Sequence, residues 1–415
     1  MSYRWLLFCL FFVVLNVNIE KKELLERAKS HYFSMGLGDG SSYLCRENMK
    51  YGLAKIHVVQ ERFGLEPNAS FLSTPDETIT RNLSRWRAGF GYGGKLVWGS
   101  GNDKIIILDV KPNACGMLVG GMDESPQPQQ LIKQISNVKE DWYIDDIKID
   151  WDFGEGNHFI NIYKVGMHAS ELDLPNYVFI IHGSVSELRK ETHKGMGLYF
   201  DKSDTLKENS KVVETMFGNL HILVDSDAQE YLNFYQYAEM FANKKRKMIA
   251  EKTFGHFTEI CNVTHQGLLN YNEILLGCHN TKNQIGTAFP ITLRADLPAF
   301  LMKGIDNLTE ETIDVLGFAK RAEKLGLIDR LRNANILPHG GGYAFKDFIG
   351  VQEVIEIEDK RYFILDMQTG IGNKICSDVR DMEFDYRGKS VVLKTVELHL
   401  GEIQARLIPY YMLKV

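Results

Sequence analysis

Four histidines in separate segments are the residues of this sequence best suited to chemistry: His158, His182, His265 and His339. The first precedes an apolar, strand-like run at 159–163, and the second directly follows another at 177–181. A histidine at the end of a buried strand is well placed to bind a metal ion, because the strand holds the imidazole ring rigidly. Four of them, each beside small or turn residues, predict ligands that are gathered from across one fold.

Cys115 is the residue that would turn these histidines into a mixed ligand set. A thiolate is a good soft ligand for Zn²⁺ or Mn²⁺ when it is paired with imidazoles, and a carboxylate such as Asp109 can bridge two hard ions. Taken alone, a cysteine in an apolar run is more often a small buried hydrophobic residue. Metal binding at Cys115 therefore depends on whether the fold brings the histidines to it.

His339 has a different setting, because three glycines follow it directly. Glycines have no Cβ, so a phosphate or nucleotide can approach the backbone and the imidazole ring closely. An imidazole held by a partner can act as a nucleophile toward phosphorus. The alternative is a simple loop without function. His279 lies in a polar segment, 278–282, and we expect it at the surface.

The pattern of apolar residues predicts the elements that must position these side chains. Helices are expected at 20–65, 228–252 and 309–335. Strands are expected at 85–120, 142–182 and from 343 to the end. Because helices and strands are grouped in blocks, without regular alternation, an α+β fold is favoured over a parallel α/β fold. We expect a single large domain with mixed β-sheets flanked by helices.

The chain divides into three expected parts: an apolar N-terminal segment at 1–20, a helical part of the domain at 21–84 and a catalytic core at 85–415. The run at 6–15, with Arg4 before it, resembles the apolar region of a signal peptide and is too short to span a bilayer comfortably. Alternatively, it belongs to the fold or is a non-native extension from an upstream start codon. We expect a cytoplasmic protein without a membrane anchor.

Composition is typical of a globular protein, with 415 residues, 44% of them hydrophobic and 25% charged. The net charge of −6 argues against a globally basic nucleic-acid binder but leaves room for a local basic groove. The six cysteines show no paired spacing, so reduced thiols are expected instead of a disulfide framework.

Taken in chain order, these segments resemble the RtcB-type RNA ligases, which depend on GTP and Mn²⁺. The most specific match is Gly-Glu-Gly-Asn-His-Phe at 154–159. His339 and its glycines resemble the family's guanylylated His-Gly-Ala-Gly site. Further similar segments lie at 109–117, 181–184, 228–246, 263–266 and 406–415. The resemblance covers roughly residues 85–415.

The resemblance implies an activity and a set of roles. Two Mn²⁺ ions would be held by Asp109, Cys115, His158, His182 and His265. His339 would attack the α-phosphate of GTP, and the GMP would pass to an RNA 3′-phosphate, derived from a 2′,3′-cyclic end. A 5′-hydroxyl of a second RNA, such as the other half of a tRNA, would then expel GMP. The nucleotide would be contacted by Asn157, Asn161, Gln266, Tyr386 and Lys414. A monomer is expected.

Some positions depart from the family's pattern. Asp109 lies six residues before Cys115, whereas the family's aspartate lies three before its cysteine, where this chain has Pro112. Tyr343 replaces the arginine after the glycines, and Asn161 replaces a glutamate. Three alternatives follow: an RNA 3′-phosphate guanylylating enzyme that does not ligate, a catalytically degenerate RNA-binding homologue, and a secreted metallohydrolase if the N-terminal run is a signal.

Overall fold

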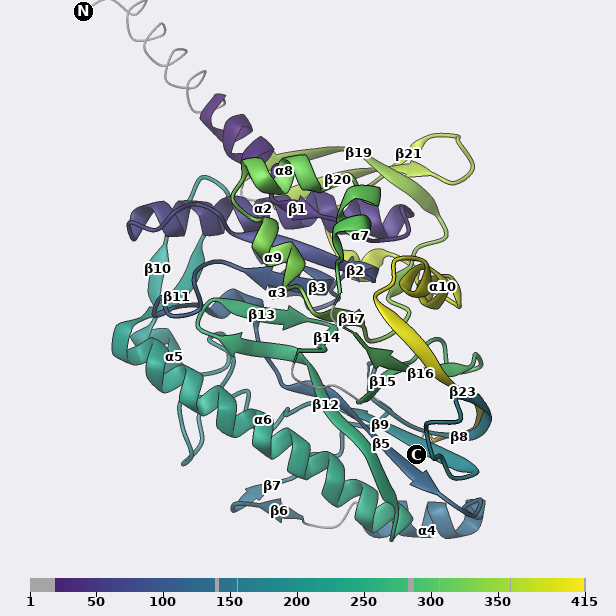
Figure 1. Cartoon of the computed structure of the whole chain (residues 1–415). Coiled ribbons are helices and arrows are strands. Elements are labelled where there is room, and N and C mark those ends of the chain that lie inside the picture. Colours follow the sequence, from purple (N-terminus) through teal and green to yellow (C-terminus); the bar gives the residue numbers. More distant parts are fainter. Residues whose placement is uncertain are drawn as a thin grey trace, which may run out of the picture.

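One β-sheet of eleven strands organises the molecule (Figure 1). The computed structural model describes residues 19–138, 142–154, 156–282, 287–305, 307–358 and 360–413. In spatial order the strands are β1 (Tyr32–Phe33), β2 (Ser70–Ile79), β3 (Gly91–Val97), β13 (Glu273–Leu276), β12 (Thr258–Asn270), β5 (Cys115–Met122), β9 (Tyr177–Gly183), β8 (Phe159–His168), β23 (Gly401–Leu413), β16 (Ala299–Gly304) and β15 (Ala288–Ile291). Only β1 and β2 pair in parallel, so the sheet is mixed.

Smaller sheets surround it. They are β4 (Ile105–Ile107) with β11 (Leu220–Val224) and β10 (Lys211–Val213); β14 (Cys278–Asn280) with β17 (Ile336–Pro338); β18 (Tyr343–Ala344) with β22 (Asp385–Tyr386); β19 (Phe348–Ile357) with β20 (Lys360–Met367) and β21 (Asn373–Cys376); and β6 (Tyr143–Ile144) with β7 (Ile147–Lys148).

Helices pack on this framework. They are 19–30, α2 (Gly40–Arg62), α3 (Leu83–Ala88), α4 (Pro128–Val138), α5 (Asp204–Asn209), α6 (Asp225–Phe254), α7 (Glu310–Val315), α8 (Ala319–Lys324), α9 (Ile328–Arg332) and α10 (Ser390–Glu397), with short 3₁₀ turns at Leu108–Val110 and Val379–Asp381. The arrangement of helices and strands confirms the α+β prediction.

Helix α6 is the longest helix and supports the strands that matter for the site. Asp225 and Asp227 lie in its first turn, where negative charge interacts favourably with the positive end of the helix dipole. The helix ends at Gly255, which has a φ of 73°. One face buries aromatic residues such as Tyr231 and Tyr235, and the helix packs on β12 and β5. In the C-terminal half of the helix, the buried Arg246 donates to the main-chain oxygens of Ala114, just before β5, and of Gly183, at the end of β9.

Several sequence expectations change in detail. The segment 309–335 is helical as expected and divides into three short helices, and 21–84 contains the strand β2 as well as helices. The expected boundary at residue 84 falls inside α3, and β2 pairs with β3 across it, so both parts share one sheet. The expectation for residues 1–20 concerns residues almost entirely outside the described part of the chain.

In the described part of the chain, no helix is both long and apolar enough to cross a membrane. The five described cysteines, Cys45, Cys115, Cys261, Cys278 and Cys376, are all buried free thiols, as the lack of paired spacing predicted.

Candidate active site

Four adjacent strands of the large sheet bring the predicted metal ligands together. Cys115 is the first residue of β5, His182 lies in β9, His265 lies in β12, and His158 directly precedes β8. The spatial order of these strands is β12-β5-β9-β8, and the register pairs His182 with Met117 of β5. Side chains near the same end of neighbouring strands therefore converge, although their positions span 150 residues of sequence.

The converging atoms lie at ligand-like separations. The Cys115 Sγ atom lies 3.0 Å from Nε2 of His182 and 3.7 Å from Nε2 of His158. The two Nε2 atoms of His182 and His265 are 3.2 Å apart. The group Cys115, His182 and His265 is buried, and its potential ligand atoms all lie within 4.8 Å of one another. These residues could hold a metal ion.

A β-bulge aims His265 at the group. Strand β12 pairs Thr264 with Gly116 and Gln266 with Cys115, so His265 is the extra residue at a register shift. A bulge lets one strand carry an additional residue and redirects its side chain. The bulge gives His265 a fully buried position beside Cys115.

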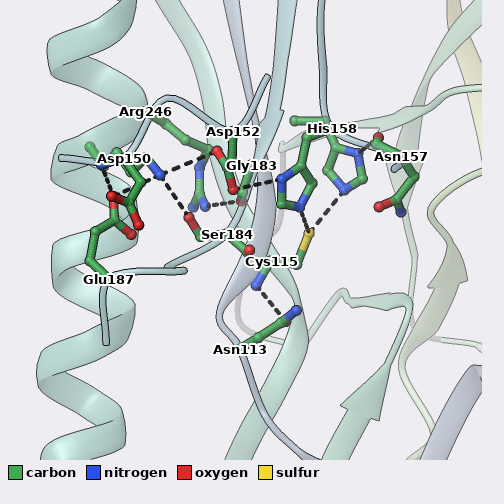
Figure 2. Close-up of polar contacts among 12 residues, drawn as sticks. Asn113, Cys115, Asp150, Asp152, Asn157, His158, Gly183, Ser184, Glu187 and Arg246 are labelled. Carbon is green, nitrogen blue, oxygen red and sulfur yellow. Dashed lines mark hydrogen bonds and ion pairs between the residues drawn. The ribbon is translucent and has the colours of Figure 1, made fainter. Parts of the chain in front are cut away.

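His158 (Figure 2) and His182 are both oriented through their Nδ1 atoms. His158 Nδ1 lies 2.8 Å from Oδ2 of Asp152, and Asp152 pairs with the buried Lys245, which also pairs with Glu187. His182 Nδ1 lies 2.7 Å from the main-chain oxygen of Asn157. Partners of this kind direct the Nε2 lone pairs of both rings toward Cys115.

The electrostatics suit a thiolate among imidazoles. Burial alone would raise the pKa of Cys115, but His182, His265 and His158 outweigh it and hold that pKa well below the usual range. Burial would also lower the pKa of His158, yet Asp152 and Cys115 raise it to about 9. Burial, reinforced by His339, lowers the pKa of His265 well below its usual value. A negative sulfur is therefore favoured at the centre of the group.

His339 lies directly beside this group. Its ring centroid is 4.5 Å from that of His265, and its Nδ1 atom lies 2.9 Å from Oδ2 of Asp76. The same carboxylate oxygen accepts the main-chain N–H groups of His339 and Gly340. The ring is thereby held through Nδ1, which leaves Nε2 as the nitrogen that could attack an electrophile.

The glycines after His339 are required by close backbone contacts. A Cβ on Gly341 would collide with the main-chain oxygen of Arg387. Gly342 has a φ of 65°, and a Cβ there would lie 2.3 Å from the main-chain oxygen of Asp76. Arg387 is itself buried and pairs with Asp39, the N-cap of α2. The loop therefore sits tightly between β2 and Arg387.

His339 and the three glycines after it line a cavity of about 340 Å³. Its walls include the ligand residues His158 and His182 and the candidate nucleophile His339. Basic and aromatic side chains complete the lining: Arg81, Arg85, Arg294, Tyr92, Tyr343 and Tyr386. Such a lining combines donors for phosphate oxygens with rings on which a base could stack.

Four of the five residues that the resemblance implies for nucleotide contact lie in the described part of the chain. Asn157, Asn161, Gln266 and Tyr386 all line the cavity. Asn161 donates to the hydroxyl of Tyr163, and Tyr386 pairs with Tyr343 across β18 and β22. The amide of Gln266 fits best donating to Tyr92 and accepting from Arg85. Lys414 lies outside the described residues.

Asp109 is not brought to the metal-ligand group. It lies in the 3₁₀ turn Leu108–Val110, where its carboxylate accepts the main-chain N–H of His221 at 2.6 Å. The ring of His221 lies 3.2 Å from the other carboxylate oxygen. The loop between this turn and β5 lies between Asp109 and Cys115 in the chain, and Asn113 of this loop accepts the main-chain N–H of Cys115.

Sequence reasoning missed Asp76 and Asp152 and misplaced His279. Asp76 and Glu77 are adjacent carboxylates in a strand whose residues are all buried, a combination that could have marked β2 as functional. Asp152 had no local signal. His279, expected at the surface, is fully buried; its ring lies 5.7 Å from that of His265, and Nε2 lies 2.9 Å from the Pro290 oxygen.

Comparison with known proteins adds no identification. No protein-family model matches the sequence, and no functionally curated protein matches it. Functional inference therefore depends on the geometry of the site and on the resemblance carried by its motifs.

Proposed function

We propose that this protein is a GTP-dependent RNA ligase that joins 2′,3′-cyclic phosphate or 3′-phosphate ends to 5′-hydroxyl ends through a histidine–GMP intermediate. The observation that carries the proposal is the arrangement of His339: Asp76 holds its Nδ1 atom, and a candidate metal ligand, His265, lies against its ring. GTP and RNA as substrates rest on the resemblance to the RtcB-type ligases.

The first step would use the chain's own groups as follows. Nε2 of His339 attacks the α-phosphorus of GTP, so a P–N bond forms while the bond to pyrophosphate breaks. Positive charge develops on the imidazole, and the carboxylate of Asp76, facing Nδ1, stabilises it. A cation bound near Cys115 would neutralise charge on the transferring phosphoryl group.

The later steps return the enzyme to its starting state. An oxygen of the RNA 3′-phosphate attacks the phosphorus of the histidine adduct, which releases His339 and leaves GMP on the RNA end. The 5′-hydroxyl of the second RNA then attacks the activated 3′-phosphate and expels GMP. Arg81, Arg85 and Arg294 in the cavity wall place positive charge beside these phosphates, and Tyr343 and Tyr386 provide stacking surfaces.

A second candidate is guanylylation of RNA 3′-phosphates without ligation. It is favoured by Tyr343, which lines the cavity where the resemblance implies an arginine for RNA-phosphate contact. In that case, the chemistry at His339 would survive while the geometry for the joining step would not.

Labelling with α-³²P GTP in the presence of Mn²⁺ or Zn²⁺ tests the proposal. An acid-labile, alkali-stable label is expected on the native chain, and it should be lost in His339→Ala but kept in His168→Ala, which alters an exposed histidine. RNA with a 3′-phosphate and a 5′-hydroxyl then separates the candidates, because a ligase yields joined product and a capping enzyme yields RNA ending in GMP. Absence of label across metals and pH would exclude both.

A further inference from the structure

We infer that Cys115, His158, His182 and His265 form one tetrahedral site for a single zinc-type cation, instead of the two-manganese centre that the resemblance implies. His158 is the fourth ligand of this site, oriented by the buried acidic residue Asp152. The inference depends on the geometry and chemistry of the ligands and does not require that the protein uses GTP or RNA.

Three of the separations between the ligand atoms lie near the edges of one tetrahedron. With Zn–S near 2.3 Å and Zn–N near 2.05 Å, ideal edges are about 3.6 Å between sulfur and nitrogen and about 3.3 Å between two nitrogens. The Sγ atom of Cys115 lies 3.0 and 3.7 Å from Nε2 of His182 and His158, and the His182 and His265 Nε2 atoms are 3.2 Å apart. A cation among Cys115, His182 and His265 requires only small adjustments, whereas the ring of His158, which lies outside the group whose ligand atoms are all within 4.8 Å of one another, must move closer to complete the site.

The chemistry of the donor set selects the metal. One thiolate and three imidazoles favour zinc, whereas Mn²⁺ prefers carboxylate, carbonyl and water oxygens and binds more weakly to a given site of this type. Cys115, His182 and His265 have exposed fractions of 2%, 2% and 0%, so the site is nearly dry. A buried tetrahedral set of cysteine and histidine ligands is typical of zinc.

A second cation would need carboxylate oxygens that the described residues have already committed. Asp109 accepts from His221, and Asp76 accepts from His339 and Gly340 through Oδ2 and from Thr74 through Oδ1. In the described ranges, Cys115, His182 and His265 make up the one group of three or more potential ligands.

The residues just before Cys115 also argue against a second cation. Pro112, three positions earlier, offers no side-chain ligand. Asn113 lies closer, but its Oδ1 atom accepts the main-chain N–H of Cys115 at 3.1 Å (Figure 2). The loop is therefore used to hold the cysteine in place, and its side chains supply no carboxylate to a neighbouring ion.

His158 is fixed as a ligand by a buried chain of charges. Its Nδ1 atom faces Asp152 (Figure 2). The other carboxylate oxygen of Asp152 lies 3.3 Å from Nζ of Lys245, and the same Nζ atom lies 2.8 Å from Glu187. The side chains of Lys245 and Glu187 are only 1% and 2% exposed, so this series of ion pairs is buried in the protein interior. A carboxylate behind a ligating histidine sets its tautomer and orients its lone pair, which makes Asp152 a positioning residue.

Metal stoichiometry on the full chain tests the inference directly. After dialysis against equal concentrations of Zn²⁺ and Mn²⁺, elemental analysis is expected to find one equivalent of zinc and almost no manganese. The Co²⁺-substituted protein should show the intense visible absorption of tetrahedral cobalt with a sulfur ligand. Two equivalents of manganese, or weak octahedral cobalt absorption, would overturn the single-site assignment. Neither readout involves GTP, so failure here leaves the GMP adduct to be judged separately.

Variants assign the ligands one by one. His158→Ala should lower zinc affinity and change the cobalt spectrum, whereas Asp109→Asn should retain one equivalent with an unchanged spectrum. Loss of metal in Asp109→Asn would instead support a carboxylate ligand. Circular dichroism on each variant establishes that it is folded, and the wild-type stoichiometry decides the question if His158→Ala does not fold.

Asp152 has a matched control two residues away. Asp152→Asn should weaken zinc binding about 10- to 100-fold and shift the cobalt spectrum. The control variant Asp150→Asn changes an exposed side chain, and the contact of Asp150 with Glu187 is made by its main-chain N–H and not by its carboxylate. It should leave both readouts unchanged. Equal affinity in the two variants would refute the positioning role of Asp152.

Discussion

Oδ2 of Asp76 lies 2.9 Å from Nδ1 of His339, although the two residues are 263 positions apart in the sequence. The contact joins the fully buried strand β2 to the glycine loop after β17, and the same oxygen accepts two main-chain N–H groups of that loop. One carboxylate therefore fixes both the ring and the backbone of the candidate nucleophile.

Replacing Asp76 by asparagine should slow formation of the histidine–GMP adduct by on the order of 10²-fold or more, because the charge that stabilises the imidazolium is removed. Single-turnover labelling with α-³²P GTP measures the rate. Glu77→Gln is the matched control: Glu77 is equally buried but faces Tyr32 and Ser34. A wild-type labelling rate in Asp76→Asn would show that the contact is only structural.

Gly342→Ala should destabilise the protein and impair labelling, because an added Cβ would collide with the main-chain oxygen of Asp76. Gly372→Ala separates this clash from backbone strain, since Gly372 has a similar φ of 71° but open space around it. Strain alone costs about 1–2 kcal/mol. Thermal unfolding should show a larger loss for Gly342→Ala, and equal losses would argue against a tight loop.

Tyr386→Ala should raise the KM for GTP by about 10-fold or more with a smaller change in kcat, because a stacked base contributes about 1–3 kcal/mol. The aromatic ring lines the cavity beside Tyr343 at a centroid distance of 5.4 Å. Tyr386→Phe should restore the KM, since it keeps the stacking surface. If both variants bind GTP like the wild type, the base lies elsewhere in the cavity.

Because Lys55 is buried, we expect the free energy of unfolding to depend on pH in the alkaline range. Burial is the main reason that its pKa falls to about 7, whereas an unfolded lysine titrates near 10.4. Between these values the unfolded chain binds a proton that the native protein does not, so the free energy of unfolding should rise with pH from about 7 to about 10.

The pKa difference corresponds to a rise on the order of 4 kcal/mol. In Lys55→Met this rise should disappear, and the variant should be more stable than wild type near neutral pH. Lys29→Met, which changes a lysine with a 56% exposed side chain, should keep the wild-type profile. Denaturant unfolding at several pH values measures both, and parallel profiles for wild type and Lys55→Met would contradict the shifted pKa.

Local sequence pattern was sufficient for the fold class and for most of the candidate ligands. Apolar runs ending at His182 or beginning after His158 are encoded in fewer than ten residues, and β-strand pattern depends on such short windows. The long helix around 228–252 was recognisable for the same reason. The division of the helical segment 309–335 into three short helices was not predicted, because turn residues within a helical composition are hard to weigh locally.

The sequence by itself determined which side chains could bind a metal or attack phosphorus, because that capacity belongs to each residue type. Only the tertiary structure decided which of them meet. The bulge at His265, the pairing of Asp76 with His339, the burial of His279 and the separation of Asp109 from Cys115 all follow from strand register and packing between distant segments. Those contacts depend on how the whole sheet assembles, and no short stretch of sequence encodes them.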